Sequence, residues 1–490
     1  MNDAFVLNIA EDWKVNTGQA LYRALYDHFR KLILSGDLKS GTQLPASRNL
    51  AEILDLSRNT VIEGYSLLQA DGFIYSKTGA GYYVSDNLAE ENLFTTGSID
   101  HNVDVTAPQI SERAKNWLRL HDQSRHTQNA QAFAPGRTAL EDFPFDVWAR
   151  LLSRRWRLSG TRLGMIEDPA GYLPLRTQLA DHLKSSRGVN CDADQILIVS
   201  GAQQGLDLIG RVLWEAGDDI VVDDPGFAGI NGVVEGAGAN LHPISIDEEG
   251  MDVETADTVH KDVKTFLVTP SRNYPLGVTM SLARRLSLLK VARDKSAWVV
   301  EDDYDSDFRF EGRPLSSLQG LDQDGRVIYV GSFSRILFPA LRLGFVVLPK
   351  TLVPAFLAAK SYIDGHTSII HQAALADFFE EGYYASHLRR MRKLYKVRRQ
   401  YMLDILENDF RDELRVLPSD GGLHICVAFK QPRDDIKFAS KLEAEGIIVR
   451  PLSRFYRNGN KQSGFLMGFA GYSENEVRLG LGKLREILSS

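Results

Sequence analysis

Cysteine is almost missing from this chain, which has only Cys191 and Cys426 among its 490 residues. The two lie far apart in the sequence and neither has a metal-ligand neighbour, so we expect a disulfide-free, cytoplasmic protein. Apolar runs long enough to span a membrane are also missing, and the first eleven residues lack the basic start and apolar core of a signal peptide. Membrane and secreted classes are therefore not expected.

An excess of basic charge is missing as well, because the formal net charge is −7. Residues 18–85 hold seven Lys or Arg residues and six Asp or Glu residues, a balance of +1. Bulk charge therefore does not indicate a nucleic-acid partner, and any argument for DNA has to rest on how particular residues are arranged.

The length of the chain exceeds what one ordinary core can bury, and the pattern changes twice along it. Residues 18–85 are dense in helical periodicity. Residues 86–131 are polar and read as a linker with one short helix near 111–120. From 132 to 490, strands alternate with helices, which predicts an α/β domain with a mainly parallel sheet.

The first of these zones has the pattern of a helix-turn-helix with a wing. Apolar residues from Leu21 to Ile33 share one helical face, and a short helix is expected over residues 46–54. Ser57 is a good N-cap for the next helix. Residues 73–75 and 82–84 are then expected to pair as two strands around a glycine-rich turn.

The arrangement within this zone suits DNA. Arg58, Asn59 and Thr60 begin the helix that Ser57 caps, where side chains can read a major groove and amides can meet a phosphate. The glycines of the turn allow close approach to a groove. The candidate DNA-binding residues are Arg48, Ser57, Arg58, Asn59, Thr60 and Gly79.

Three motifs in residues 18–85 resemble the GntR-type winged-helix domain. They are Leu44-Pro45-Ala46-Ser47-Arg48, Leu56-Ser57-Arg58 with Thr60-Val61, and Gly79-x-Gly81-x-x-Val84. The resemblance implies that the partner is a double-stranded DNA operator. A winged helix that makes only protein contacts is the alternative.

In the third zone, a strand over residues 195–199 leads into a glycine-bearing turn and then a helix that begins near Ala202. The amides at such a helix start form a ready phosphate site, although many turns of this kind are merely structural. A later strand over 327–330 leads to Ser332, Arg335 and Arg342. These residues offer a hydroxyl and two guanidiniums for a phosphate.

Between these segments, the strand at residues 298–300 runs into the acidic stretch Glu301-Asp302-Asp303-Tyr304-Asp305. Carboxylates at the carboxyl end of a buried strand lie where α/β proteins bind ligands. One of them could keep a pyridinium nitrogen protonated, and Tyr304 could bind a phenolic oxygen. We expect most of the other acids to be caps or to face solvent.

The order of motifs in the third zone resembles the class I aminotransferase domain of fold-type I pyridoxal-phosphate (PLP) enzymes. The motifs run from Asp168-Pro169-Ala170-Gly171 through Asp224-Pro225-Gly226-Phe227 and Thr269-Pro270-Ser271-Arg272-Asn273-Tyr274-Pro275 to the segment Gly331 to Arg342. Together with the GntR-type head, the chain resembles MocR-type transcription regulators. That resemblance implies a large subdomain to about residue 370, a small C-terminal subdomain, and a homodimer in which each winged helix crosses to its partner.

The resemblance also implies roles for single residues. The amides of Ala202 and Gln203, with Ser332 and Arg342, would bind the PLP phosphate, and Phe227 would stack on the ring. Asp302 would pair with the ring nitrogen. Tyr304, with help from Asn273, would bind the 3-hydroxyl.

Three positions depart from that pattern. Arg335 stands where the family has the lysine that holds PLP as an imine, and Ile166 stands where a tyrosine usually reaches the neighbouring subunit's site. Ser463 takes the place of the arginine that clamps an amino acid's α-carboxylate. Nearby arginines that could substitute are Arg450, Arg454 and Arg457.

Arginine is permanently protonated and cannot form the imine. We therefore expect a regulator without transaminase activity that binds PLP or a related form noncovalently, with Arg335 in the site and an amino acid or vitamin B6 form as effector. The pocket could instead be empty or repurposed. Two other classes stay open: an aminotransferase with a DNA-binding head that uses another lysine such as Lys360, and a constitutive DNA-binding protein whose large domain only dimerises.

Overall fold

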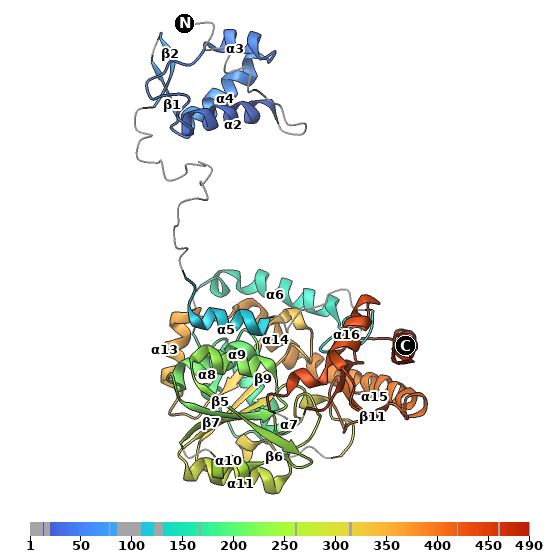
Figure 1. Cartoon of the computed structure of the whole chain (residues 1–490). Coiled ribbons are helices and arrows are strands. Elements are labelled where there is room, and N and C mark those ends of the chain that lie inside the picture. Colours follow the sequence, from blue (N-terminus) through green and yellow to red (C-terminus); the bar gives the residue numbers. More distant parts are fainter. Residues whose placement is uncertain are drawn as a thin grey trace. The chain divides into compact units, whose positions relative to one another are not determined.

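The computed structural model divides into two compact units, Met1–Gln109 and Ile110–Ser490 (Figure 1). The structure describes residue 13 and residues 20–77, 79–85, 109–121, 131–165, 168–259, 262–312, 316–418, 420–458 and 461–489.

The first unit is the predicted winged helix-turn-helix. Its elements are α2 (Leu21–Leu34), α3 (Ser47–Ile53), α4 (Arg58–Ala70), β1 (Ile74–Lys77) and β2 (Gly81–Val84). The buried side chains of Phe29 on α2, Leu50 on α3 and Tyr65 on α4 belong to one core, and β1 pairs with β2 in antiparallel register to form the wing. Ser57 caps α4 as expected, because its hydroxyl accepts a hydrogen bond from the amide of Thr60 at 3.1 Å.

An eight-stranded sheet forms the centre of the second unit, in the order β3-β10-β9-β8-β7-β4-β5-β6. Its core from β9 to β5 is parallel, while β10 and β6 run antiparallel to their neighbours, so the predicted mainly parallel sheet is confirmed. The strands are β3 (Ile196–Val199), β4 (Asp219–Asp224), β5 (Asn240–Asp247), β6 (Gly250–Met251), β7 (Val263–Val268), β8 (Trp298–Asp303), β9 (Val327–Ser332) and β10 (Gly344–Val347).

Helices cover both faces of this sheet because alternate strand residues point to opposite sides. Val221 of β4 packs toward α10 and α11, whereas its neighbours Ile220 and Val222 pack toward α8 and α9, on the other side (Figure 1). The helices of this large subdomain are α5 (Glu112–His121), α6 (Phe145–Leu163), α7 (Leu173–Arg187), α8 (Ala202–Leu213), α9 (Ala228–Ala237), α10 (Val253–Val259), α11 (Leu282–Asp294), α12 (Leu318–Leu321), α13 (Val353–Ile363) and α14 (Ile369–Glu380).

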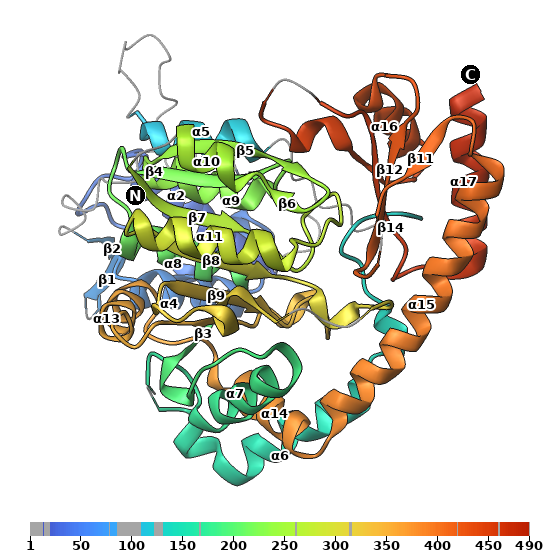
Figure 2. The ribbon, with the colours of Figure 1, turned by 90° about the horizontal axis from the view of Figure 1, so that it is seen from below.

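A smaller antiparallel sheet, in the order β11-β12-β14-β13, forms the C-terminal subdomain. The long helix α15 leads into it and runs beside α17 (Figure 2). The elements are α15 (Tyr383–Asp409), β11 (Leu414–Val416), β12 (His424–Phe429), α16 (Asp435–Ala444), β13 (Arg450–Pro451), β14 (Gly464–Gly468) and α17 (Glu474–Ser489). Short 3₁₀ turns lie at 140–142, 193–195, 306–308, 339–341 and 452–455.

Helix α5 falls within the stretch that the sequence predicts as linker, and the expected short helix is confirmed there. It packs against α9, and the half-exposed Trp117 donates its indole hydrogen to the carbonyl oxygen of Gly232 at 3.0 Å. The C-terminal part of the linker therefore belongs to the second unit.

Both cysteines are buried and unpaired, as expected. In the described parts of the chain, no helix combines the length and the apolar character needed to cross a bilayer.

Candidate ligand-binding site

A cavity of about 180 Å³ lies at the carboxyl ends of β7, β8 and β9, where open α/β sheets bind ligands. Every predicted cofactor-binding residue except Asn273 lines it. The lining residues are Ala202, Gln203, Phe227, Thr269, Tyr274, Asp302, Tyr304, Ser332, Ser334, Arg335 and Arg342. Since a water molecule needs only about 10–15 Å³ of such volume, the cavity has room for a small organic molecule.

One end of the cavity is built to receive an anion. Helix α8 begins there at Ala202, and the amides of Gln204 and Gly205 turn back to the carbonyl oxygen of Gly201, which leaves the first amides of the helix at its open end. Arg342 lies beside this turn and donates to the carbonyl oxygen of Ser200 at 3.1 Å.

Two backbone features hold Arg342 close to the start of α8. Gly201 has a φ of 88°, and a Cβ there would lie 3.0 Å from a guanidinium nitrogen of Arg342, so glycine allows the arginine to approach. Arg342 itself has a φ of 50°, which is uncommon outside glycine and costs backbone strain. The surrounding structure holds this arginine in one place.

Asp302 provides the only carboxylate among the lining residues of this cavity. It lies on β8 and is 5% exposed, and its Oδ1 atom has no hydrogen-bond partner among the described residues. Burial raises the pKa of Asp302 to about 7, with Asp303 adding to the rise and the charge of Arg335 opposing it. A buried acceptor without a partner is suited to a ligand donor such as a protonated ring nitrogen.

Aromatic side chains form the wall beside Asp302. Phe227 and Tyr274 meet edge to face with ring centroids 5.7 Å apart, and Tyr274 makes a similar contact with Tyr304 at 5.6 Å. Arg272 donates a hydrogen bond to the hydroxyl oxygen of Tyr304 at 3.0 Å. The phenolic hydrogen of Tyr304 is thereby left to donate to a ligand oxygen.

The structure places Asn273 behind this wall. Its side-chain amide lies 3.3 Å from the carbonyl oxygen of Pro225 and 3.4 Å from Asp223, and its own oxygen accepts from the amide of Leu276. Asn273 therefore fixes the loops that carry Phe227 and Tyr274, and it does not line the cavity.

The other acids at the end of β8 are buried, so the expectation that they would face solvent is wrong, although Glu301 does act as a cap. Glu301 accepts two amides at the start of α12, and Asp303 pairs with the buried Arg187. Burial raises the pKa of Asp303, but Arg187 and the hydrogen bonds of Ser306 and Tyr329 outweigh it and hold the pKa below its ordinary value.

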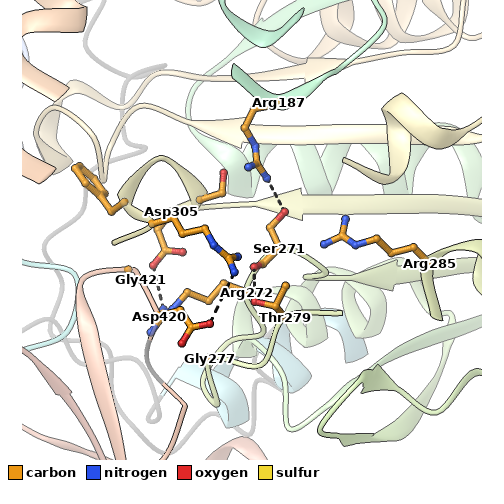
Figure 3. Close-up of a pocket in the computed structure, with 13 residues that line it drawn as sticks. Arg187, Ser271, Arg272, Gly277, Thr279, Arg285, Asp305, Asp420 and Gly421 are labelled. Carbon is orange, nitrogen blue, oxygen red and sulfur yellow. Dashed lines mark hydrogen bonds and ion pairs between the residues drawn. The ribbon is translucent and has the colours of Figure 1, made fainter. Parts of the chain in front are cut away.

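Behind the ligand cavity lies a cluster of buried arginines (Figure 3). Arg187 donates to the hydroxyl of Ser271, and Arg272 pairs with Asp305 at 3.1 Å. The cavity between them has about 20 Å³, which is enough for one water molecule and too small for a larger ligand. This cluster supports Asp303 and Tyr304 from behind.

Arg335 reaches into the ligand cavity from the segment after β9. Its guanidinium carbon lies 5.4 Å from the ring centroid of Tyr304, and a Cβ on Gly136 would lie 3.4 Å from its Nη1 atom. That Nη1 atom is buried and has no hydrogen-bond partner among the described residues. No lysine is among the residues that line the cavity.

Lys360, the alternative amine, lies elsewhere. Its side chain is fully buried in α13, where its Nζ atom donates to Asp364 at 2.5 Å and to Thr367 at 3.2 Å. Asp364 in turn accepts from Gln204, whose side-chain oxygen accepts the amide of Ser200. Lys360 therefore supports the anion-binding end from behind and does not line the cavity.

Of the two remaining departures, Ser463 is not among the described residues that line the cavity. Ile166 lies outside the described residues. Ser463 precedes β14, and its hydroxyl accepts from the amide of Arg433 at 3.2 Å. Of the arginines considered as substitutes, Arg457 pairs with Glu235 in α9, and none lines the cavity.

Sequence reasoning missed three lining residues, Thr269, Tyr274 and Ser334. Thr269 directly follows β7, so its place at the carboxyl end of a parallel strand was a signal that could have found it. Tyr274 depends on the path of a loop before Pro275, which no local pattern specifies.

The candidate DNA-binding residues lie together on the first unit. Arg48 on α3 is exposed, as are Arg58 and Asn59 at the start of α4, where Ser57 and Thr60 form the cap. Gly79, in the wing turn, has a φ of 76° with no atom within 4 Å of a Cβ built on it. The helix start and the wing tip are thus open to a partner.

Comparison with known proteins covers both units. Residues 21–84 match the bacterial regulatory proteins of the gntR family, and residues 137–484 match aminotransferase class I and II. The second unit is similar to a Pyrococcus horikoshii kynurenine aminotransferase solved in complex with PMP, at a TM-score of 0.69 and 28% identity over 82% of this chain and 98% of that one.

Curated relatives share both parts. The probable rhizopine catabolism regulatory protein MocR of Rhizobium meliloti is 37% identical over 95% of this chain and 93% of that protein. The pyridoxine biosynthesis regulator PdxR of Corynebacterium glutamicum is 27% identical, with 95% of each chain covered. With a gntR-type head joined to an aminotransferase class I and II domain, and similarity to MocR over nearly its whole length, the chain belongs to the MocR-type family of HTH transcriptional regulators.

Proposed function

We propose that this regulator binds a double-stranded DNA operator as a cytoplasmic homodimer and changes its affinity for that operator when a small molecule enters the cavity of the second unit. The observation that carries the proposal is the composition of that cavity. It keeps an anion-binding end and the unpartnered Asp302, but Arg335 takes the place of the lysine.

The residues of the cavity fit PLP or a related phosphorylated pyridine, held noncovalently. The phosphate would bind at the start of α8 with Ser332 and Arg342, and the ring nitrogen would donate to Asp302. Phe227 would lie against the ring, and Tyr304 would donate to the 3-hydroxyl oxygen. In enzymes, PLP supplies an electron-withdrawing ring for amine chemistry.

Transamination is not part of this proposal, because the chain's own groups do not support it. Arg335 stays protonated and cannot bond covalently to PLP or accept a proton from a substrate carbon. Lys360, the other lysine considered, is buried against Asp364 and Thr367.

A path from the cavity toward the linker supports the regulatory step. Phe227, which lines the cavity, is also the N-cap residue of α9. Further along α9, Gly232 and Gly236 contact Trp117 of α5, the helix that lies within the linker. A ligand that moves Phe227 would therefore bias the position of α5, in a shift between two populations of the domain.

The test uses the purified full-length protein and a duplex that this protein selects from random DNA. PLP is added, the absorbance spectrum is recorded, and borohydride reduction is followed by peptide mapping. A saturable spectrum with no modified lysine, together with a changed operator affinity, supports the proposal. A specific modified lysine with amino-acid turnover would instead show an enzyme, and a complete lack of binding would leave the large domain as a dimerisation unit.

A further inference from the structure

Because of Arg335, the lining of the cavity carries more positive than negative charge. Its guanidinium and that of Arg342 line the cavity together with the positive end of α8, and Asp302 is the single carboxylate among the lining residues. A phosphorylated pyridine would satisfy Arg342 with its phosphate and Asp302 with its ring nitrogen. Arg335 would then have no anionic partner from the ligand.

The surroundings of Arg335 do not supply that partner either. Its Nη1 atom is buried without an acceptor, and its guanidinium lies over the ring of Tyr304. The charge of Arg335 opposes the rise in the pKa of both Asp302 and Asp305, but among the described residues no ion pair joins Arg335 to a carboxylate. Arg335 as a whole is half-buried, but a buried guanidinium nitrogen without an acceptor is costly, so a ligand that offers Nη1 an acceptor gains affinity.

We infer that Arg335 selects a ligand with a second anionic group, namely the 4-carboxylate form of the phosphorylated pyridine, over the aldehyde and above all over the amine. The inference rests on the proposed function. Arg335 occupies the position of the residue that bonds to the aldehyde carbon in the enzymes this domain resembles. Its guanidinium would therefore face the substituent at position 4 of the ring.

The chemistry of that substituent then decides the affinity. A carboxylate matches the planar fork of arginine and can accept two parallel hydrogen bonds. An aldehyde has one neutral acceptor oxygen, so it cannot form that parallel pair of charge-assisted bonds. The ammonium group of pyridoxamine phosphate offers only donors and repels the guanidinium, so this form should bind most weakly.

The test is isothermal titration of the full-length protein with three probes that share ring and phosphate: 4-pyridoxic acid 5′-phosphate, PLP and pyridoxamine 5′-phosphate. We expect the acid to bind at least about tenfold more tightly than the amine, with the aldehyde between them. In Arg335→Met, which keeps an unbranched, flexible side chain but removes the charged end, the three affinities should fall within about threefold of each other. In Arg335→Lys the preference for the acid over the aldehyde should be lost.

The outcomes separate this inference from the proposed function. If none of the three probes binds the wild-type protein, the proposed function fails. If all three bind with equal affinity, or the amine binds most tightly, the function stands and the role of Arg335 is refuted. The ranking on the wild-type protein decides the matter even where a variant does not fold.

Discussion

Trp117 of α5 donates a hydrogen bond of 3.0 Å from its indole nitrogen to the carbonyl oxygen of Gly232 in α9, and this bond helps to hold the linker helix on the ligand domain. The contact is reinforced by Gly236, because a Cβ at that position would lie 2.8 Å from the same indole nitrogen. Since Phe227 in the cavity wall is the N-cap residue of α9, this pair connects the helix at the cavity to the linker helix.

Replacing Trp117 by alanine should uncouple ligand binding from operator binding. The variant is expected to bind PLP with an affinity within about twofold of the wild type, because Trp117 does not line the cavity. Its operator affinity, measured by fluorescence anisotropy, should respond much less to the ligand, because α5 loses its anchor on α9.

Two further variants control that experiment. Gly236→Ala places a methyl group against the indole and should reproduce the loss of response while Trp117 is still present. Leu118→Ala changes the neighbouring side chain of α5, which is 64% exposed, and should leave the response intact. An undiminished response in both Trp117→Ala and Gly236→Ala would exclude this path.

Asp302→Asn should stabilise the ligand-free protein at alkaline pH. Burial raises the pKa of Asp302 from its ordinary value of 3.8 to about 7, so the folded protein holds a proton between these values that the unfolded chain has lost. Stability from this group therefore falls as pH rises through that window. Above pH 7 the folded protein carries the full free-energy cost of the buried, ionised carboxylate. A rise of about three pKa units corresponds to a loss of at most roughly 4 kcal/mol in unfolding free energy.

Urea denaturation at two pH values measures this effect. The gain in unfolding free energy from Asp302→Asn should be near zero at pH 4 and largest at pH 8. The control, Asp294→Asn, removes a side chain that is 56% exposed and should change little at either pH. The same Asp302→Asn variant should bind PLP at least about tenfold more weakly, since a neutral amide replaces the charged acceptor. A gain in unfolding free energy that does not change with pH would contradict the raised pKa of Asp302.

Much of the fold could be predicted from sequence because each signal was local. The N-cap at Ser57, the glycine turn before Ala202 and the apolar strand before Glu301 each mark an element where the structure has one. Because successive residues of a strand point to opposite faces, the sequence also predicts that Asp302 points away from the side of Glu301 and Asp303. It could not show which face meets the cavity, because that depends on how distant helices pack.

The unpredicted parts of the site depend on contacts distant in sequence. Arg272 reaches Tyr304 and His424, which lies 152 residues away, so nothing near Arg272 reveals its role. Asn273 lies one residue further along but turns behind the wall. The environment of Lys360 is likewise fixed by the packing of α13 against α8, which sequence patterns do not specify.

Lys360→Met should weaken the anion-binding end without changing the chemistry of the site. The variant leaves Asp364 without its buried partner and should lower the unfolding free energy by about 2 kcal/mol. PLP affinity should fall modestly, because Asp364 holds Gln204 and Gln204 holds the amide of Ser200. The absorbance spectrum of bound PLP should not change.

Lys350→Met is the matched control for that variant, because Lys350 is 74% exposed and its pairing with Asp192 lies at the surface. It should alter stability by no more than about 0.5 kcal/mol. A loss of a covalent PLP signal in Lys360→Met would show that this lysine is the amine of an enzyme after all.

Arg58→Ala should weaken operator binding and reduce its dependence on salt. Arg58 is exposed at the start of α4, beside the cap formed by Ser57 and Thr60, where a side chain can reach a base edge or a phosphate. Loss of a phosphate contact lowers the slope of log affinity against log salt by about one, and loss of a base contact costs about 1–3 kcal/mol at one position. Anisotropy titrations at several salt concentrations distinguish the two kinds of contact.

The control is Lys39→Ala, which removes an exposed lysine from the loop after α2 and should leave the operator affinity and its salt slope nearly unchanged. Equal effects of both substitutions would argue against a specific reading role for Arg58.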